Sequence, residues 1–90
     1  MRKLVWTDHC EYNLAETVAV LNVINPHGHS ANEIKAHVQR EFDNGLVSYV
    51  GTGGWYATVY KAPGSEDTWN VLVTLMTFTV ARYLKIRGRM

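Results

Sequence analysis

Residues 68–86 read TWNVLVTLMTFTVARYLKI, and the fold depends on whether this stretch forms a helix or a strand. Read with a period of two, both faces of residues 71–78 are apolar, which is typical of a central strand rich in β-branched residues. Read with a helical period, one stripe is apolar and consists of Trp69, Val73, Met76, Val80 and Leu84. We favour a helix, because 19 residues far exceed the roughly 5 to 6 of an ordinary strand.

The residues that flank this stretch also favour a helix. Ser65 can cap its N-terminus, and Glu66 and Asp67 would then lie in the first turn, where the helix dipole stabilises acids. The dipole stabilises bases at the other end, where the sequence has Arg82, Lys85 and Arg87. The sequence therefore predicts one helix over residues 68–86.

This predicted helix is too short to cross a membrane. Its uncharged run covers residues 68–81, which is 14 residues, whereas a bilayer requires about 20. We expect a helix that is buried in the core, or one that pairs two copies of the chain as a homodimer.

The first of two further predicted helices covers residues 9–24. Asp8 can cap its N-terminus, and Pro26 ends it because proline lacks a backbone amide. Its apolar residues at helical spacing are Leu14, Val18, Leu21 and Ile24.

The second of these helices covers residues 31–43 and has the clearest signature. Ser30 and Glu33 form a capping box, in which two free backbone amides are satisfied reciprocally. Gly45 then supplies the left-handed residue that commonly ends a helix.

Residues 46–61 predict a β-hairpin. The segments 46–50 and 55–61 are rich in Val, Tyr and Trp, and they flank the turn sequence Gly51-Thr52-Gly53-Gly54. Alternate residues of a strand point to opposite faces of the sheet. The expected core face consists of Trp55, Ala57 and Val59, and the expected tyrosine face of Tyr56, Thr58 and Tyr60.

The chain of 90 residues is long enough for one domain only. With 47% apolar, 11% aromatic and 19% charged residues, its composition excludes intrinsic disorder. Residues 3–6 are expected to add a third strand. The predicted fold over residues 1–90 is therefore a single α+β domain with the order (β)-α-α-β-β-α, in which an antiparallel hairpin or three-stranded sheet packs against helices.

The single cysteine, Cys10, bears on the compartment and on metal binding. One thiol excludes an internal disulfide and every zinc pattern that uses several cysteines, and it fits a reducing compartment. The first residues are basic and then apolar, but Asp8 interrupts them before a secretory signal can form. We expect a cytoplasmic protein.

The net charge of +1 combines two regions of opposite sign. All eight acids lie between Asp8 and Asp67, together with only three bases. The other six bases lie at the ends of the chain and are Arg2, Lys3, Arg82, Lys85, Arg87 and Arg89. Dipole compensation explains part of this pattern. If the two ends meet, they form a small basic surface that attracts phosphate or an acidic protein.

Few residues suggest catalysis or metal binding, and they are His9, Cys10, His27, His29 and His37. Their spacing matches no structural zinc pattern, and no known motif marks the thiol as a nucleophile. The glycine-rich turn is followed by a strand and lacks a lysine, so it is not a phosphate-binding loop. We expect no enzyme activity, no metal and no cofactor, and an enzyme that uses the thiol or the histidines is the third alternative.

The aromatic residues of the hairpin are the strongest functional signal. Tyr and Trp are enriched at binding hot spots, because they combine a large apolar area with a polar tip. The predicted contact anchors for a protein partner are Tyr49, Trp55, Tyr56 and Tyr60. The bases predicted to attract an acidic partner are Arg82, Lys85 and Arg87.

The leading hypothesis is therefore a non-enzymatic protein-binding module. Small free-standing proteins of this kind are frequent among phage-encoded inhibitors of host or defence machinery, including anti-CRISPR proteins. No residue of the sequence specifies such a target.

The order helix, helix, hairpin, helix also resembles a winged-helix module, in which a hairpin wing follows a helical pair and a C-terminal helix pairs two subunits. This resemblance implies a small nucleic-acid-binding regulator that is dimeric through residues 68–86. The helix over residues 31–43 would have to read DNA bases with Asn32, Lys35, Gln39 and Arg40. Because that helix also carries three acids, nucleic-acid binding is the alternative and not the leading hypothesis.

Overall fold

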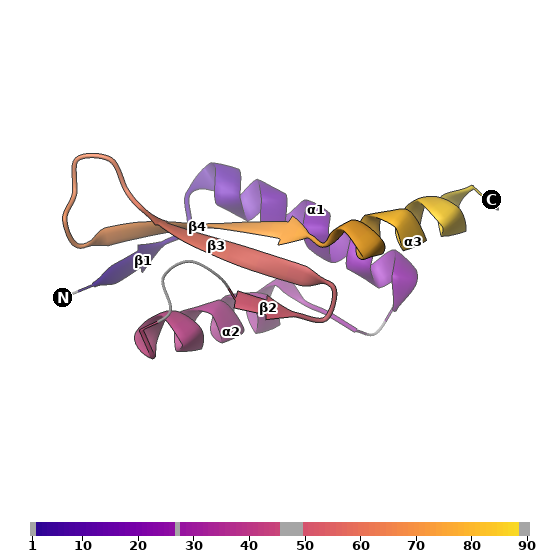
Figure 1. Ribbon diagram of the computed structural model, residues 1–90, viewed down its shortest axis with the longest axis horizontal. Coiled ribbons are helices and arrows are strands. Elements are labelled where there is room, and N and C mark those ends of the chain that lie inside the picture. The colour runs from indigo at the N-terminus through magenta and orange to yellow at the C-terminus, as the bar shows by residue number, and fades with distance from the viewer. Residues whose placement is uncertain (1, 27, 46–49, 89–90) are drawn as a thin grey trace.

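A computed structural model describes residues 2–26, 28–45 and 50–88 of the chain, and for residues 50–52 it describes the backbone alone. These residues form one small domain (Figure 1). Its elements in chain order are β1 (Lys3–Val5), α1 (Asp8–Ile24), α2 (Ala31–Asp43), β2 (Val50–Thr52), β3 (Trp55–Lys61), β4 (Thr68–Leu75) and α3 (Thr77–Arg87). The predicted α+β class is confirmed, with one strand more than the predicted order contains.

The four strands form one mixed sheet in the order β1-β4-β3-β2. β3 and β4 are antiparallel, and their register runs from Trp55 beside Leu75 to Lys61 beside Trp69. β1 pairs in parallel with the start of β4, and β2 pairs antiparallel with β3. The predicted N-terminal strand is therefore confirmed. A hairpin is confirmed as well, but its turn is Gly53-Gly54 alone, because Gly51 and Thr52 belong to β2. Residues 46–49 of the predicted first strand lie outside the described residues.

The largest difference from the sequence prediction lies in residues 68–86. One helix over this whole stretch is wrong, because residues 68–75 are the strand β4 and the helix begins only at Thr77. Ser65 does not cap a helix. Its Oγ accepts a hydrogen bond from the Thr68 amide (3.2 Å) and donates one to Asp67 Oδ1 (3.1 Å), in the turn that enters β4.

The physical reason is that β4 has partner strands on both sides. Pairing with β1 and β3 satisfies its backbone amides and carbonyls without a helix. The alternation of the strand buries Val71 and Val73, whose β-branched side chains pack well on a sheet and lose rotamer freedom in a helix. Tertiary pairing therefore outweighs the length argument.

Both N-terminal helices cover the same face of the sheet (Figure 1). On that face the core residues of the strands are Trp55, Ala57, Val59, Val71 and Val73. The helices contribute Leu14, Leu21, Ile34, Val38 and Phe42 to the same core. The predicted alternation of β3, with its tyrosines on the opposite face, is confirmed.

The N-termini of α1 and α2 are capped by hydroxyl side chains. Half of the predicted capping box of α2 is confirmed, since Ser30 Oγ accepts a hydrogen bond from the Glu33 amide at 3.2 Å. The described residues show no return bond from the Ser30 amide to the Glu33 carboxylate. The cap of α1 is Thr7 and not Asp8, because the Thr7 hydroxyl accepts from the Cys10 amide at 3.3 Å.

The start of α3 is attached to the turn between β2 and β3. Gly53 and Gly54 have φ angles of 59° and 94°, the left-handed conformation that this two-residue turn requires. The Gly54 carbonyl accepts hydrogen bonds from the Met76 amide (2.9 Å) and the Thr79 hydroxyl (2.8 Å). Thr79 is also the buried residue of α3. These bonds fix where α3 leaves the body of the protein.

We expect Gly54→Ala to destabilise the fold more than an ordinary glycine substitution in a turn. A Cβ at this position would lie 2.6 Å from Thr79 Oγ1, and alanine would have to adopt the same positive φ. The expected loss in the free energy of unfolding is about 2–4 kcal/mol, from backbone strain and steric overlap together. Urea denaturation measures it.

Gly64→Ala is the matched control for this measurement. Gly64 has a φ of 75°, but no atom lies within 4 Å of the added Cβ. This variant should therefore lose only the strain contribution, about 1 kcal/mol. Equal losses in the two variants would contradict the close packing of Thr79 on the turn.

Candidate functional site

α3 extends beyond the end of the sheet (Figure 1). The molecule measures 48 × 22 × 19 Å, and its radius of gyration is 14.0 Å. A compact domain of this length would have a radius of gyration of roughly 12 Å. α3 packs against α1, and Thr79 is its buried residue. The helix therefore leaves most of its surface in solvent.

The exposed side of α3 carries an apolar stripe. Four exposed residues recur at the spacing i, i+3, i+4 and i+7, which places them on one face of a helix. We call them the α3 stripe, and they are Thr77, Val80, Ala81 and Leu84. Leu84 is 61% exposed, and Phe78 beside the stripe is 65% exposed. Surface helices normally direct this spacing toward the core. Val80 also lines a cavity with residues of α1 and β4, so the part of the stripe without a partner in the described chain is centred on Leu84.

Two bases flank the α3 stripe, Lys85 on one side and Arg87 on the other, whereas Arg82 lies toward the Thr79 side of the helix. All three are exposed. Arg87 lies over the Tyr83 ring, 6.0 Å from its centroid. The ion pair found among the described residues joins Lys35 to Glu11 instead. The predicted steering bases are therefore accessible to an acidic partner.

Among the described residues, the bases at the two ends of the chain do not form one surface, and Arg89 lies outside those residues. The two described groups of bases lie at opposite ends of the long axis of the molecule (Figure 1). Arg2 donates a hydrogen bond to the Phe42 carbonyl at 3.2 Å, and its guanidinium lies over the rings of Phe42 and Trp69. The expectation of a shared basic surface is wrong, because the N-terminal charge packs on the body far from α3.

The predicted aromatic anchors lie in different surroundings. Trp55 is 2% exposed and lies on the core face that the alternation of β3 predicts, so its side chain is not available as the predicted surface anchor. Tyr56 is half-buried, and Tyr60 is 42% exposed. Tyr49 lies outside the described residues. The hairpin therefore offers less aromatic surface than the sequence predicts.

The α3 stripe is the surface that sequence reasoning missed. A single helix from residue 68 places Val80 and Leu84 on its buried side, because the apolar period continues from Trp69. The actual helix starts at Thr77 and packs through the Thr79 side instead. The sequence did contain one signal for an exposed surface here: residues 68–87 include three bases and no acid that could pair with them.

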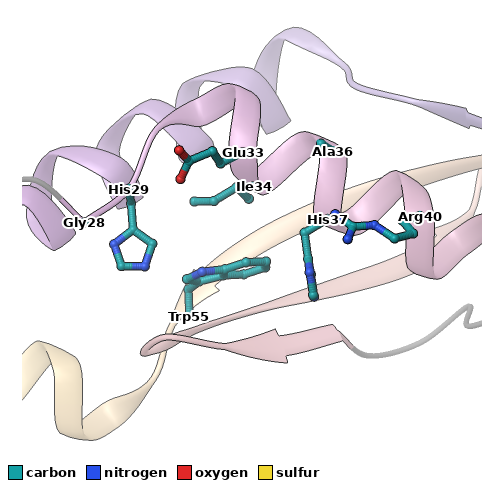
Figure 2. Close-up of a pocket in the computed structure, with 8 residues that line it drawn as sticks. All are labelled: Gly28, His29, Glu33, Ile34, Ala36, His37, Arg40 and Trp55. Atoms are coloured by element: carbon teal, nitrogen blue, oxygen red, sulfur yellow. The ribbon is translucent and has the colours of Figure 1, made fainter.

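A groove lies between α2 and the hairpin, with a volume of about 370 Å³ (Figure 2). Figure 2 shows Trp55 beneath α2, with the His37 ring edge-on to it at a centroid distance of 5.7 Å. Glu33 and Arg40 line the groove with opposite charges, and none of its lining residues is a thiol or a hydroxyl. The groove therefore lacks a nucleophile and a dominant charge.

The other candidates for chemistry do not form a site in the part of the chain that the structure describes. Cys10 is fully buried, and its Sγ accepts a hydrogen bond from the Thr7 hydroxyl at 3.1 Å. His9 is exposed, and His27 lies outside the described residues. No three His, Cys, Asp or Glu side chains among the described residues are arranged to hold a metal ion.

No family model, curated protein or solved structure matches this chain. Within the described residues, none of the helices has the length and apolar character needed to cross a membrane. The inference of function therefore rests on the surfaces of the molecule itself.

We expect the Cys10 thiol to be unreactive in the native protein, because it is fully buried and hydrogen-bonded. Dithiobis-nitrobenzoate should modify less than a tenth of it in the time that modifies all of it in denaturant. Tyr12→Cys is the control, since Tyr12 is 63% exposed and a thiol there should react at once. Rapid modification of native Cys10 would restore it as a candidate nucleophile.

Proposed function

We propose that this protein is a non-enzymatic protein-binding module that docks α3 into an apolar groove on an acidic protein partner. The observation that carries the proposal is the α3 stripe, which is exposed at the spacing by which amphipathic helices dock into grooves. Leu84 is the expected central anchor, because it is the largest side chain of the stripe and is 61% exposed.

The charge of α3 supports an acidic partner. Its exposed side chains include three bases, and the helix contains no acid. Bases around an apolar contact increase the rate of association with an acidic surface and disfavour basic ones. The α3 of a second copy carries no acid to complement these bases, so a different protein with an acidic surface is the favoured occupant.

The hairpin adds only a small part of the proposed binding surface. Tyr60 has the exposure that a supporting contact needs, whereas α3 supplies the larger apolar surface. The identity of the acidic partner stays a prediction. The predicted partner is a component of host or defence machinery, as for phage-encoded inhibitors such as anti-CRISPR proteins.

Nucleic-acid binding has less support. β4 lies between the hairpin and α3, so the element order departs from that of a winged-helix module. On α2, Lys35 forms an ion pair with Glu11, and Gln39 Nε2 donates a hydrogen bond to Asp43 Oδ1 at 2.9 Å. Two of the four side chains that would read DNA bases are therefore already engaged.

Affinity capture from a lysate of the source cell, with and without nuclease, tests the proposal. We expect a protein partner that survives nuclease, and whose purified form binds the wild-type chain with a Kd that rises with salt. Leu84→Glu should weaken this binding at least tenfold, because it places a charge in the apolar contact. Isothermal titration calorimetry measures the change.

Tyr12→Glu is the matched control, since it introduces the same charge at a similarly exposed helical position on α1. It should bind the partner as the wild type does, and circular dichroism should show both variants folded. Equal binding by Leu84→Glu and the wild type would overturn the proposal. Loss of the captured material after nuclease would favour nucleic acid instead, and a wild-type dimer that Leu84→Glu dissociates would favour a second copy.

A further inference from the structure

A second cavity lies where the end of α1, the hairpin turn and the first turn of α3 meet, and its volume is about 480 Å³. Leu21 and Ile24 of α1 and Phe78 of α3 form its apolar wall, and Gly53 and Gly54 form the wall at the turn. Small-molecule sites commonly have volumes of roughly 300–1,000 Å³ and mostly apolar linings. The cavity therefore has the size and the lining of a small-ligand site.

Arg82 gives this cavity its charge. Among the described residues that line it, Arg82 is the charged one, and no Asp or Glu is present to neutralise it. The side chain is exposed and forms no ion pair with the described part of the chain. A guanidinium binds carboxylates through paired, charge-assisted hydrogen bonds. The cavity therefore favours an anionic group at its Arg82 end.

His29 supplies a second polar group at the cavity wall. Its Nδ1 is buried and has no hydrogen-bond partner among the described residues, and its Nε2 would lie 2.8 Å from a Cβ at Gly53. A buried nitrogen without a partner is unfavourable. An imidazole nitrogen can donate or accept a hydrogen bond, and a carboxylate in the cavity would serve the ring as an acceptor. His29 also lines the groove under α2, so its unpaired nitrogen supports a polar ligand without fixing the charge of that ligand.

The first turn of α3 also attracts anions, although more weakly than Arg82 does. Met76 precedes the helix and provides no side-chain cap, and Phe78 and Thr79 of the first turn line the cavity. The uncapped N-terminal amides carry the positive end of the helix dipole. Arg82 and the first turn of α3 therefore favour an anion, and His29 adds a polar contact, in a mostly apolar space whose other polar lining side chains are Asn25 and Thr79.

We propose that this cavity binds a small apolar carboxylate. The hydrocarbon part packs on Leu21, Ile24 and Phe78, and the carboxylate pairs with Arg82 and accepts a hydrogen bond from His29. The proposal goes beyond protein binding, and the two are separable because Leu84, the anchor of the α3 stripe, does not line the cavity.

An NMR titration of the ¹⁵N-labelled protein tests this proposal with two carboxylates, decanoate below its micelle concentration and N-acetylphenylalanine. We expect saturable shifts of the Gly53, Gly54 and Thr79 amides. Decanol, which has the same chain as decanoate without the charge, should bind at least tenfold more weakly. Tighter binding of decanoate would identify a lipid-like ligand, and tighter binding of N-acetylphenylalanine a peptide C-terminus.

Arg82→Gln should raise the Kd for the tighter carboxylate at least tenfold while the unliganded spectrum stays that of a folded protein. Lys61→Gln is the matched control, since it removes one exposed positive charge at the end of β3, away from the cavity residues, and it should leave the Kd unchanged. The proposal is overturned if neither carboxylate gives saturable shifts at the cavity amides. Equal affinity for decanol, or equal weakening in the two variants, would overturn it as well.

Discussion

The pairing of β4 with β3 is the constraint on which the rest of this structure depends. It aligns Val71 and Val73 with Ala57 and Val59, so that one face of the sheet becomes apolar and both N-terminal helices can cover it. It also gives the parallel strand β1 its only partner in the described sheet. Without the backbone hydrogen bonds between β4 and β3, nothing would stabilise an extended conformation in the stretch from residue 68. The length of its apolar run would then favour a helix.

The same pairing sets the position of α3. β4 ends at Leu75, next to the hairpin turn, because Leu75 pairs with the first residue of β3. The Gly54 carbonyl at that turn then accepts hydrogen bonds from Met76 and Thr79. The strand and the turn together orient α3 so that its Thr79 side faces the body and its apolar stripe faces solvent. A hydrogen-bonded turn of two glycines thus determines which side chains the protein presents.

Both proposals place function at the projecting end of the molecule. The α3 stripe is an apolar surface rimmed by bases, and the cavity beneath the first turn of α3 combines an apolar wall with Arg82. The segregation of charge along the chain explains why both favour anionic partners, since every acid precedes α3. Arg2 takes no part, because it is held against Phe42 at the opposite end.

Sequence reasoning was reliable where the signal is local. The capping box at Ser30, the left-handed Gly45 and the paired glycines of the hairpin each act within a few residues, and the structure confirms α2 and the hairpin. The alternation of β3 likewise follows from the chain geometry of a strand.

The sequence did not predict the structure of segments that depend on partners far away in the chain. The strand β4 and the outward orientation of Leu84 follow from pairing and packing between residues far apart in the chain. An apolar repeat in the sequence shows which side chains favour burial. The packing of the sheet and the helices decides whether they are buried within this chain or against a binding partner.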